Sequence, residues 1–72
     1  MGSLPLESRS PVIRAATAAG YRVLFGRYGR MWRWYVYEPH CITGPSYYGE
    51  RPTKREAVAA AERAIMHATM GV

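Results

Sequence analysis

Two kinds of side chain alternate along residues 31–38, and no other feature of the sequence constrains the fold as strongly. Every second position is bulky and apolar, and the positions between are charged or amphipathic: Trp32, Trp34 and Val36, then Arg33, Tyr35 and Tyr37. Successive side chains of a strand point to opposite faces, so this alternation predicts a strand with one buried and one outward face. Aromatic and β-branched residues are also enriched in strands.

A hairpin is expected at the start of this strand. Residues 21–26 alternate with the same period, which places two sets of side chains on opposite faces: Tyr21, Val23 and Phe25, then Arg22, Leu24 and Gly26. Residues 27–30 break the pattern, and Gly29 can adopt the positive φ that a tight turn requires. The sequence therefore predicts two antiparallel strands joined by a short turn.

A third strand is expected after a turn at residues 39–40. Residues 41–43 and 46–48 carry strand-forming side chains but are interrupted at Gly44 and Pro45. Proline cannot donate a hydrogen bond to a sheet ladder. This strand is therefore expected at an edge of the sheet, with a bulge or in two short pieces.

A short helix is expected near the N-terminus. Ser10 offers an N-cap hydroxyl, and Pro11 suits the first helical position, where no amide hydrogen bond is lost. Gly20 can supply the left-handed residue that ends such a helix. The helix would span about two turns and must pack against the rest of the chain to be stable.

The C-terminal helix has the clearest boundaries. Residues 53–56 form a capping box, in which Thr53 is the N-cap and Glu56 is placed to bond back to its amide. No glycine or proline interrupts residues 57–70, and Gly71 is expected to end the helix. One stripe of the helix is apolar and nearly all alanine: Ala57, Val58, Ala61, Ala64, Ile65 and Ala68. Such a stripe lets a helix approach a sheet closely.

These elements predict an α+β fold, a three-stranded antiparallel sheet packed on a C-terminal α-helix. The order is α-β-β-β-α, or β-β-β-α if the first helix does not form. Residues 1–10 are expected to be a flexible tail and residues 11–72 a single small domain. Trp34 is expected in the core, against Ala61 and Ile65 of the last helix.

The chain is basic, with a formal net charge of +5 over 72 residues. Nine of its ten basic residues are arginine, and Asp, Asn and Gln are absent. Codon usage in a GC-rich genome also favours arginine over lysine, but it does not set the ratio of bases to acids. The positive charge favours anionic partners, and arginine suits phosphates, base edges and aromatic stacking.

Catalytic chemistry has little support in the sequence. Cys41 and His40 are neighbours, and neighbours on a strand would point to opposite faces, while His67 lies on the distant helix. One cysteine and two histidines without ligand spacing do not make a zinc site. We therefore expect no enzyme activity, no cofactor and no metal. A single cysteine and the lack of a membrane-length apolar run fit a protein of the bacterial cytoplasm, with no membrane partner.

A basic and aromatic surface is the strongest functional signal. If Trp32 and Trp34 face the helix, an opposite set faces outward, with two further arginines flanking the turn: Arg22, Arg33, Tyr35 and Tyr37, then Arg27 and Arg30. Such a sheet face can bind nucleic acid, DNA or RNA, by contacting grooves or stacking bases. Alternatively, the tyrosines and arginines only cover the back of the sheet.

Two family resemblances point the same way. Residues 53–61, Thr-Lys-Arg-Glu-Ala-Val-Ala-Ala-Ala, resemble the start of the last helix of double-stranded-RNA-binding domains. That resemblance implies that Lys54 and Arg55 meet phosphates. The predicted sheet backed by a C-terminal helix resembles the arm-type DNA-binding domain of phage and transposon integrases, whose Arg- and aromatic-rich sheet face enters the major groove. The Trp-x-Trp-x-Val strand and the helix after it also resemble small prophage proteins.

The sequence is also compatible with two other hypotheses, inhibition of a host defence complex and formation of a homodimer. Small basic proteins without catalytic residues include phage inhibitors of host defence complexes, such as anti-CRISPR proteins, which act by occluding a protein surface or a nucleoprotein channel. Tyrosine and arginine are favoured hot-spot residues in protein interfaces as well. An interrupted third strand would also leave an unpaired ladder through which two copies could form a homodimer.

Overall fold

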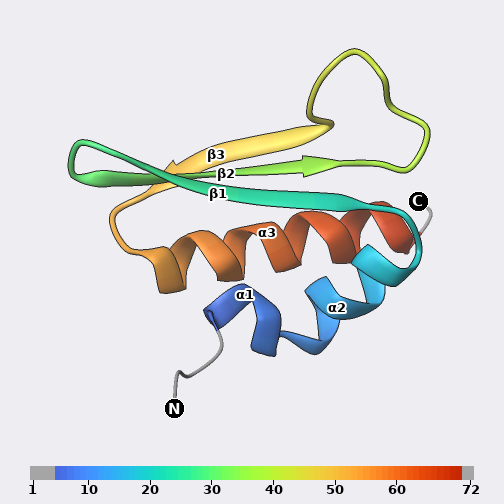
Figure 1. Cartoon of the computed structure of the whole chain (residues 1–72), viewed down its shortest axis with the longest axis horizontal. Coiled ribbons are helices and arrows are strands. Elements are labelled where there is room, and N and C mark those ends of the chain that lie inside the picture. Colours follow the sequence, from blue (N-terminus) through green and yellow to red (C-terminus); the bar gives the residue numbers. More distant parts are fainter. Residues whose placement is uncertain (1–4, 71–72) are drawn as a thin grey trace.

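The computed structural model describes residues 5–70, which form one sheet with all of their helices on one side of it (Figure 1). The elements follow in the order α1 (Leu6–Arg9), α2 (Pro11–Ala18), β1 (Arg22–Tyr28), β2 (Met31–Tyr37), β3 (Tyr47–Arg51) and α3 (Lys54–Thr69). The α+β class, the three-stranded antiparallel sheet and the C-terminal helix packed on it are as the sequence predicts.

β2 is the central strand, with β1 and β3 antiparallel on either side. Val36 pairs with Val23 on one side and with Tyr47 on the other, and all three belong to the face that meets the helices. The expected hairpin forms between β1 and β2, and Gly29 has a φ of 63° in its turn.

The core lies between β2 and α3. Val36 and Ala61 are fully buried, and Ile65 is 3% exposed. Small side chains on α3 allow the helix to approach the sheet, as the alanine stripe predicts. Ile13 and Ala16 of α2 complete the core from the second helix, because α2 packs against both α3 and β1.

Trp34 packs against this core on the predicted face, but it is only half-buried, and Val36 occupies the centre instead. The indole extends toward β3, where its register partner is Gly49. A Cβ placed on Gly49 would lie 2.9 Å from the indole Nε1 and 3.0 Å from Cε2 and Cζ2. The indole therefore occupies the space that a side chain at position 49 would need.

Gly49→Ala is expected to destabilise the fold by about 1–3 kcal/mol, the cost of overpacking a close contact. Alanine in a strand would otherwise be neutral or stabilising relative to glycine. Chemical denaturation of Gly49→Ala, with and without Trp34→Phe, measures the contact, because phenylalanine is shorter than the indole. We expect a smaller penalty in the Trp34→Phe background. Equal penalties in both backgrounds would show that the close contact is not the cause.

The first predicted helix forms as α2. The Ser10 hydroxyl accepts a hydrogen bond from the Ile13 amide at 3.2 Å, and Pro11 is the first helical residue. Gly20 follows the helix with a φ of 102°, a left-handed conformation that glycine adopts without a steric cost.

Residues 6–9, which were expected to belong to a flexible tail, form the single-turn helix α1. Tertiary contacts hold this single turn: Nζ of Lys54 lies 2.9 Å from Oε1 of Glu7, and the Ser10 hydroxyl donates to the Glu62 carboxylate. Burial opposes ionisation of Glu7, but the hydrogen bond from Lys54 outweighs it together with smaller favourable contributions, so the pKa of Glu7 is lowered. Residues 1–4 of the expected tail lie outside the described residues.

The third strand is shorter and later than expected. Residues 41–43 belong to the loop between β2 and β3, and the strand includes only Tyr47–Arg51. Gly44 has a φ of 150° in that loop, which is incompatible with a continuous strand through this point. Within the described residues, β3 pairs with β2 alone and so lies at an edge, as predicted.

α3 begins at its predicted cap. The Thr53 hydroxyl accepts a hydrogen bond from the Glu56 amide at 3.1 Å. The Glu56 carboxylate differs from the expected arrangement, because it receives the Thr53 hydroxyl at 3.0 Å rather than the Thr53 amide. The predicted closing residue, Gly71, lies outside the described residues. None of the described helices is both long and apolar enough to cross a membrane.

Thr53→Ala is expected to cost roughly 1 kcal/mol of stability, since it leaves the Glu56 amide without its capping acceptor. Thermal and urea denaturation followed by circular dichroism would measure the loss. Thr53→Ser keeps the hydroxyl and is the matched control, with an expected change of only a few tenths of a kcal/mol. Equal losses in both variants would show that the cap is not what stabilises this end of α3.

Candidate nucleic-acid interface

The candidate interface is the face of the sheet turned away from the helices, which no described element covers (Figure 1). Strand register places ten residues on it, and we call this set the open face: Arg22, Leu24, Gly26, Tyr28, Met31, Arg33, Tyr35, Tyr37, Tyr48 and Glu50. Four of the six tyrosines in the chain belong to it. The sequence prediction that Arg22, Arg33, Tyr35 and Tyr37 share one face agrees with this register.

Both arginines of the open face lie on tyrosine rings. The guanidinium carbon of Arg22 is 5.0 Å from the centroid of the Tyr37 ring, and that of Arg33 is 4.4 Å from the Tyr28 ring. At these distances the ring attracts the cation and restricts its side chain. The open face therefore carries flat cations supported by aromatic rings.

Arg33 also forms an ion pair across the sheet. Its Nε donates to Oε2 of Glu50 at 2.7 Å, and the two residues are direct partners in the pairing of β2 with β3. Hydrogen bonds to Glu50 and to Tyr35 raise the pKa of Arg33. The side chains of Arg33 and Glu50 are each 44% exposed, so the pair remains accessible from solvent.

Three residues of the open face were not among the site residues predicted from the sequence: Tyr28, Tyr48 and Glu50. Glu50 and Tyr48 lie on the open face because of the register in which β3 pairs with β2. The alternation of β2 alone does not determine this register. Tyr28 was assigned to the turn, although it continues the outward set of β1 and pairs with Met31. Extending the period of β1 by two residues would have found it.

A shallow hollow of about 320 Å³ lies on the open face between β2 and β3. Its lining consists of a cross-strand tyrosine pair, the ion pair and the strand glycine: Tyr35, Tyr48, Arg33, Glu50 and Gly49. The hollow thus presents aromatic surface, a hydrogen-bond donor and a hydrogen-bond acceptor in one place.

The other predicted site residues lie at one end of the sheet or in the helix layer. Arg27 pairs with Trp32 and so belongs to the helix-facing side, and its Nε donates to the Gly29 carbonyl at 3.3 Å. Arg30 follows Gly29 in the exposed turn. These two arginines therefore flank the tip of the hairpin, as predicted.

Lys54 and Arg55, which the resemblance to double-stranded-RNA-binding domains implied as phosphate contacts, lie in the first turn of α3 and not on the open face. Lys54 pairs with Glu7, and its Nζ is 5.4 Å from the centroid of the Trp32 ring. Arg55 is exposed and lines a hollow between α1 and α3. The open face and these two residues do not form one surface.

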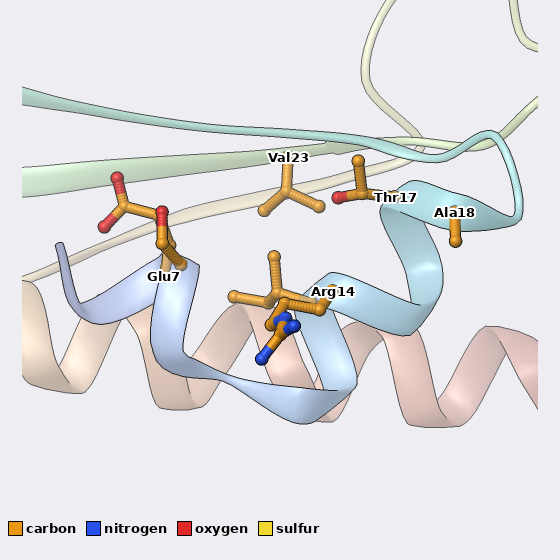
Figure 2. Close-up of a pocket in the computed structure, with 7 residues that line it drawn as sticks. Glu7, Arg14, Thr17, Ala18 and Val23 are labelled. Atoms are coloured by element: carbon orange, nitrogen blue, oxygen red, sulfur yellow. The ribbon is translucent and has the colours of Figure 1, made fainter. Parts of the chain in front are cut away.

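A larger hollow of about 460 Å³ lies on the helix side, between α1, α2 and β1 (Figure 2). Glu7 and Arg14 point in different directions, Val23 lies above Arg14 on β1, and Thr17 and Ala18 lie at the end of α2 away from Glu7. The Glu7 carboxylate is already paired with Lys54. This hollow presents no converging set of polar groups.

Cys41 lies in the loop before β3, so the expected strand geometry does not apply to it. Its thiol donates to the Gly44 carbonyl, with Sγ 2.8 Å from the oxygen, rather than to its neighbour His40. A hydrogen bond with the Ser46 side chain is the main cause of a lowered pKa of this thiol, and backbone hydrogen bonds at residues 43 and 44 add to it. Within residues 5–70, no group of three or more His, Cys, Asp or Glu side chains could hold a metal ion.

Comparison with known proteins adds no identification. The sequence matches no protein-family model and no curated protein, and the fold matches no solved structure.

Proposed function

We propose that this protein binds nucleic acid through the open face and that it prefers single strands. The observation that carries the proposal is the pairing of both open-face arginines with tyrosine rings, at 5.0 Å and 4.4 Å. Bases of a single strand stack on aromatic rings and on guanidinium planes. A duplex hides its base faces, so it would gain less from such a surface.

The charge distribution supports the same proposal. Arg22 lies on the open face without an acidic neighbour in its register pair, and Arg27 and Arg30 lie at the hairpin tip. Arg33 is matched by Glu50 and adds little net positive charge. About three arginines are thus placed to contact phosphates while bases occupy the tyrosines.

Salt dependence provides the first test. With three phosphate contacts, the logarithm of the association constant should fall against the logarithm of salt concentration with a slope of about −2 for a single strand. Arg22→Ala should reduce this slope by about 0.7 and weaken binding to single-stranded DNA and RNA. Fluorescence anisotropy with labelled oligonucleotides measures both quantities.

Arg63→Ala is the matched control, because Arg63 is an exposed arginine of α3 on the opposite side of the sheet. It removes the same charge and should leave the slope unchanged within error. Equal effects of the two substitutions would assign binding to net charge alone. No binding at low salt to single-stranded or duplex DNA or RNA would refute the proposed function.

A protein partner is the second candidate function. Three apolar or aromatic side chains of the open face are strongly exposed: Leu24 at 45%, Tyr28 at 51% and Tyr48 at 65%. Such residues anchor protein interfaces, and the protein would then act as an inhibitor of a host defence complex by occluding its surface. If nucleic-acid binding fails, open-face substitutions should instead abolish capture of that complex without lowering the melting temperature.

The protein partner of this second candidate function can also be another copy of the chain, bound through a strand edge. β1 and β3 each pair on one side only within residues 5–70, so each leaves one ladder edge unpaired. Two copies could pair through either edge to form a homodimer. Sedimentation equilibrium across a concentration series would show a dimer, and a monomer at all concentrations would exclude this arrangement.

A further inference from the structure

We infer that the hollow between β2 and β3 binds guanine and that Glu50 selects this base. The inference rests on the proposed function, since it takes the guanine from a single strand held on the open face. Tyr35 and Tyr48 supply aromatic surface, and Arg33 and Glu50 supply the polar groups that a base edge requires.

The hollow is large enough to admit one base. Its volume of about 320 Å³ is open to solvent along the sheet surface, so a base can enter without displacing any element of the fold. Tyr35 and Tyr48 are direct cross-strand partners, whose Cβ atoms are typically about 5 Å apart. A base lying on this pair covers aromatic surface that is otherwise exposed, since Tyr48 is 65% exposed.

Glu50 is the unusual member of a surface proposed to bind a polyanion. A carboxylate repels phosphate, so its presence on the open face opposes simple electrostatic binding. An ionised carboxylate has two oxygens and accepts hydrogen bonds only. Oε2 receives the Arg33 Nε at 2.7 Å, and the side chain is still 44% exposed. Glu50 can therefore accept further donors from a ligand.

Guanine is the base that matches this carboxylate. Its Watson–Crick edge presents two adjacent donors, N1–H and the N2 amino group, beside the O6 acceptor. Adenine and cytosine offer one amino group there, and thymine or uracil offers one ring N–H between two acceptors. The N1–H and N2 amino group can both donate to Glu50, while the guanidinium of Arg33 donates to O6.

The geometry of Arg33 favours this arrangement before any ligand binds. The guanidinium lies over Tyr28 at 4.4 Å and is fixed on another side by Glu50. A side chain already held in place loses less conformational freedom on binding. Arg33 therefore acts as a positioned donor, which also holds the Glu50 carboxylate at the edge of the hollow.

The test uses fluorescein-labelled dT10 and decamers in which one central thymine is replaced by guanine, hypoxanthine, adenine or cytosine. Anisotropy titrations at low salt should show the guanine decamer binding about tenfold more tightly than dT10. Hypoxanthine lacks the N2 amino group, so its decamer should bind roughly threefold more weakly than the guanine decamer. These comparisons use the unaltered protein and depend on no variant.

Two charge-matched variants test the role assigned to Glu50. Glu50→Gln retains the shape but loses the charge and one acceptor, so the preference for guanine should fall below about twofold while affinity for dT10 stays equal or rises. Glu38→Gln removes the same charge outside the hollow and should keep the tenfold preference.

The outcomes separate the two proposals. Tight binding of every decamer without a preference for guanine would overturn this inference and leave the proposed function intact, as would a preference for adenine or cytosine. A guanine preference that survives Glu50→Gln would overturn the role of Glu50. If no decamer binds, both the inference and the proposed function are wrong.

Discussion

Trp34→Ala is expected to remove about 3 kcal/mol of folding stability, the low end of the range for deleting a large aromatic side chain from a core. The low end applies because the indole is half-buried, whereas Val36 is fully buried. Small domains have only about 5–10 kcal/mol of stability in total. The variant should therefore unfold at a much lower urea concentration, and a fraction should be unfolded at 37 °C.

The indole nitrogen of Trp34 bears on how the effect of Trp34→Ala compares with that of Trp34→Phe. Nε1 of Trp34 is buried and has no hydrogen-bond acceptor among the described residues. A buried donor without an acceptor costs free energy, and phenylalanine has no such donor. Trp34→Phe is thus the matched control and should cost much less than Trp34→Ala. Unfolding of Trp34→Ala within about 0.5 kcal/mol of the parent protein would show that this side chain does not support the core.

Tyr35→Ala is expected to weaken single-strand binding about tenfold, because base–aromatic stacking contributes about 1–3 kcal/mol per base. Tyr35 lies at the middle of β2, between Leu24 of β1 and Tyr48 of β3. A base stacked there would be near the centre of the open face. Duplex binding should change by less than about twofold, because duplex bases are not free to stack.

Tyr35→Phe is the control for this prediction, since it retains the ring and removes only the hydroxyl. Single-strand affinity of Tyr35→Phe should remain within about threefold of the parent protein. Equal losses for single strands and duplexes in Tyr35→Ala would contradict stacking and indicate a general loss of surface structure. Melting curves of each variant, measured in parallel, would distinguish a loss of structure from a loss of stacking.

Sequence periodicity was sufficient for the parts of the fold in which a local pattern determines burial. The alternation in residues 31–38 identified both faces of β2, and Thr53 marked the start of α3 within one residue. Ser10 and Pro11 likewise marked the start of α2, because capping depends on side chains next to the backbone groups that they satisfy.

Tertiary contacts determined the features that the sequence did not predict. α1 is four residues long and has no buried residue, so its helical conformation depends on contacts such as the pair between Glu7 and Lys54. The same pair places Lys54 in the helix layer. The resemblance that implied a phosphate contact for Lys54 considered only the local motif.

The register of β3 explains why the site predicted from the sequence did not include Tyr48 and Glu50. A shift of one residue would exchange Tyr48 and Glu50 with Tyr47 and Gly49 on the open face. The fit of the Trp34 indole to Gly49 and of Tyr47 to the core is consistent with the observed register. Neither contact follows from the alternation of a single strand.

Chemical-shift mapping would show directly whether single strands bind on the open face. Uniformly ¹⁵N-labelled protein would be titrated with dT10 at low salt while backbone amide resonances are followed. We expect the largest shifts in β2 and β3 around Arg33, Tyr35 and Tyr48, with smaller shifts at the hairpin tip and little change in α2 and the second half of α3. Shifts concentrated on the helix side, or no shifts at a saturating concentration of dT10, would contradict binding on the open face.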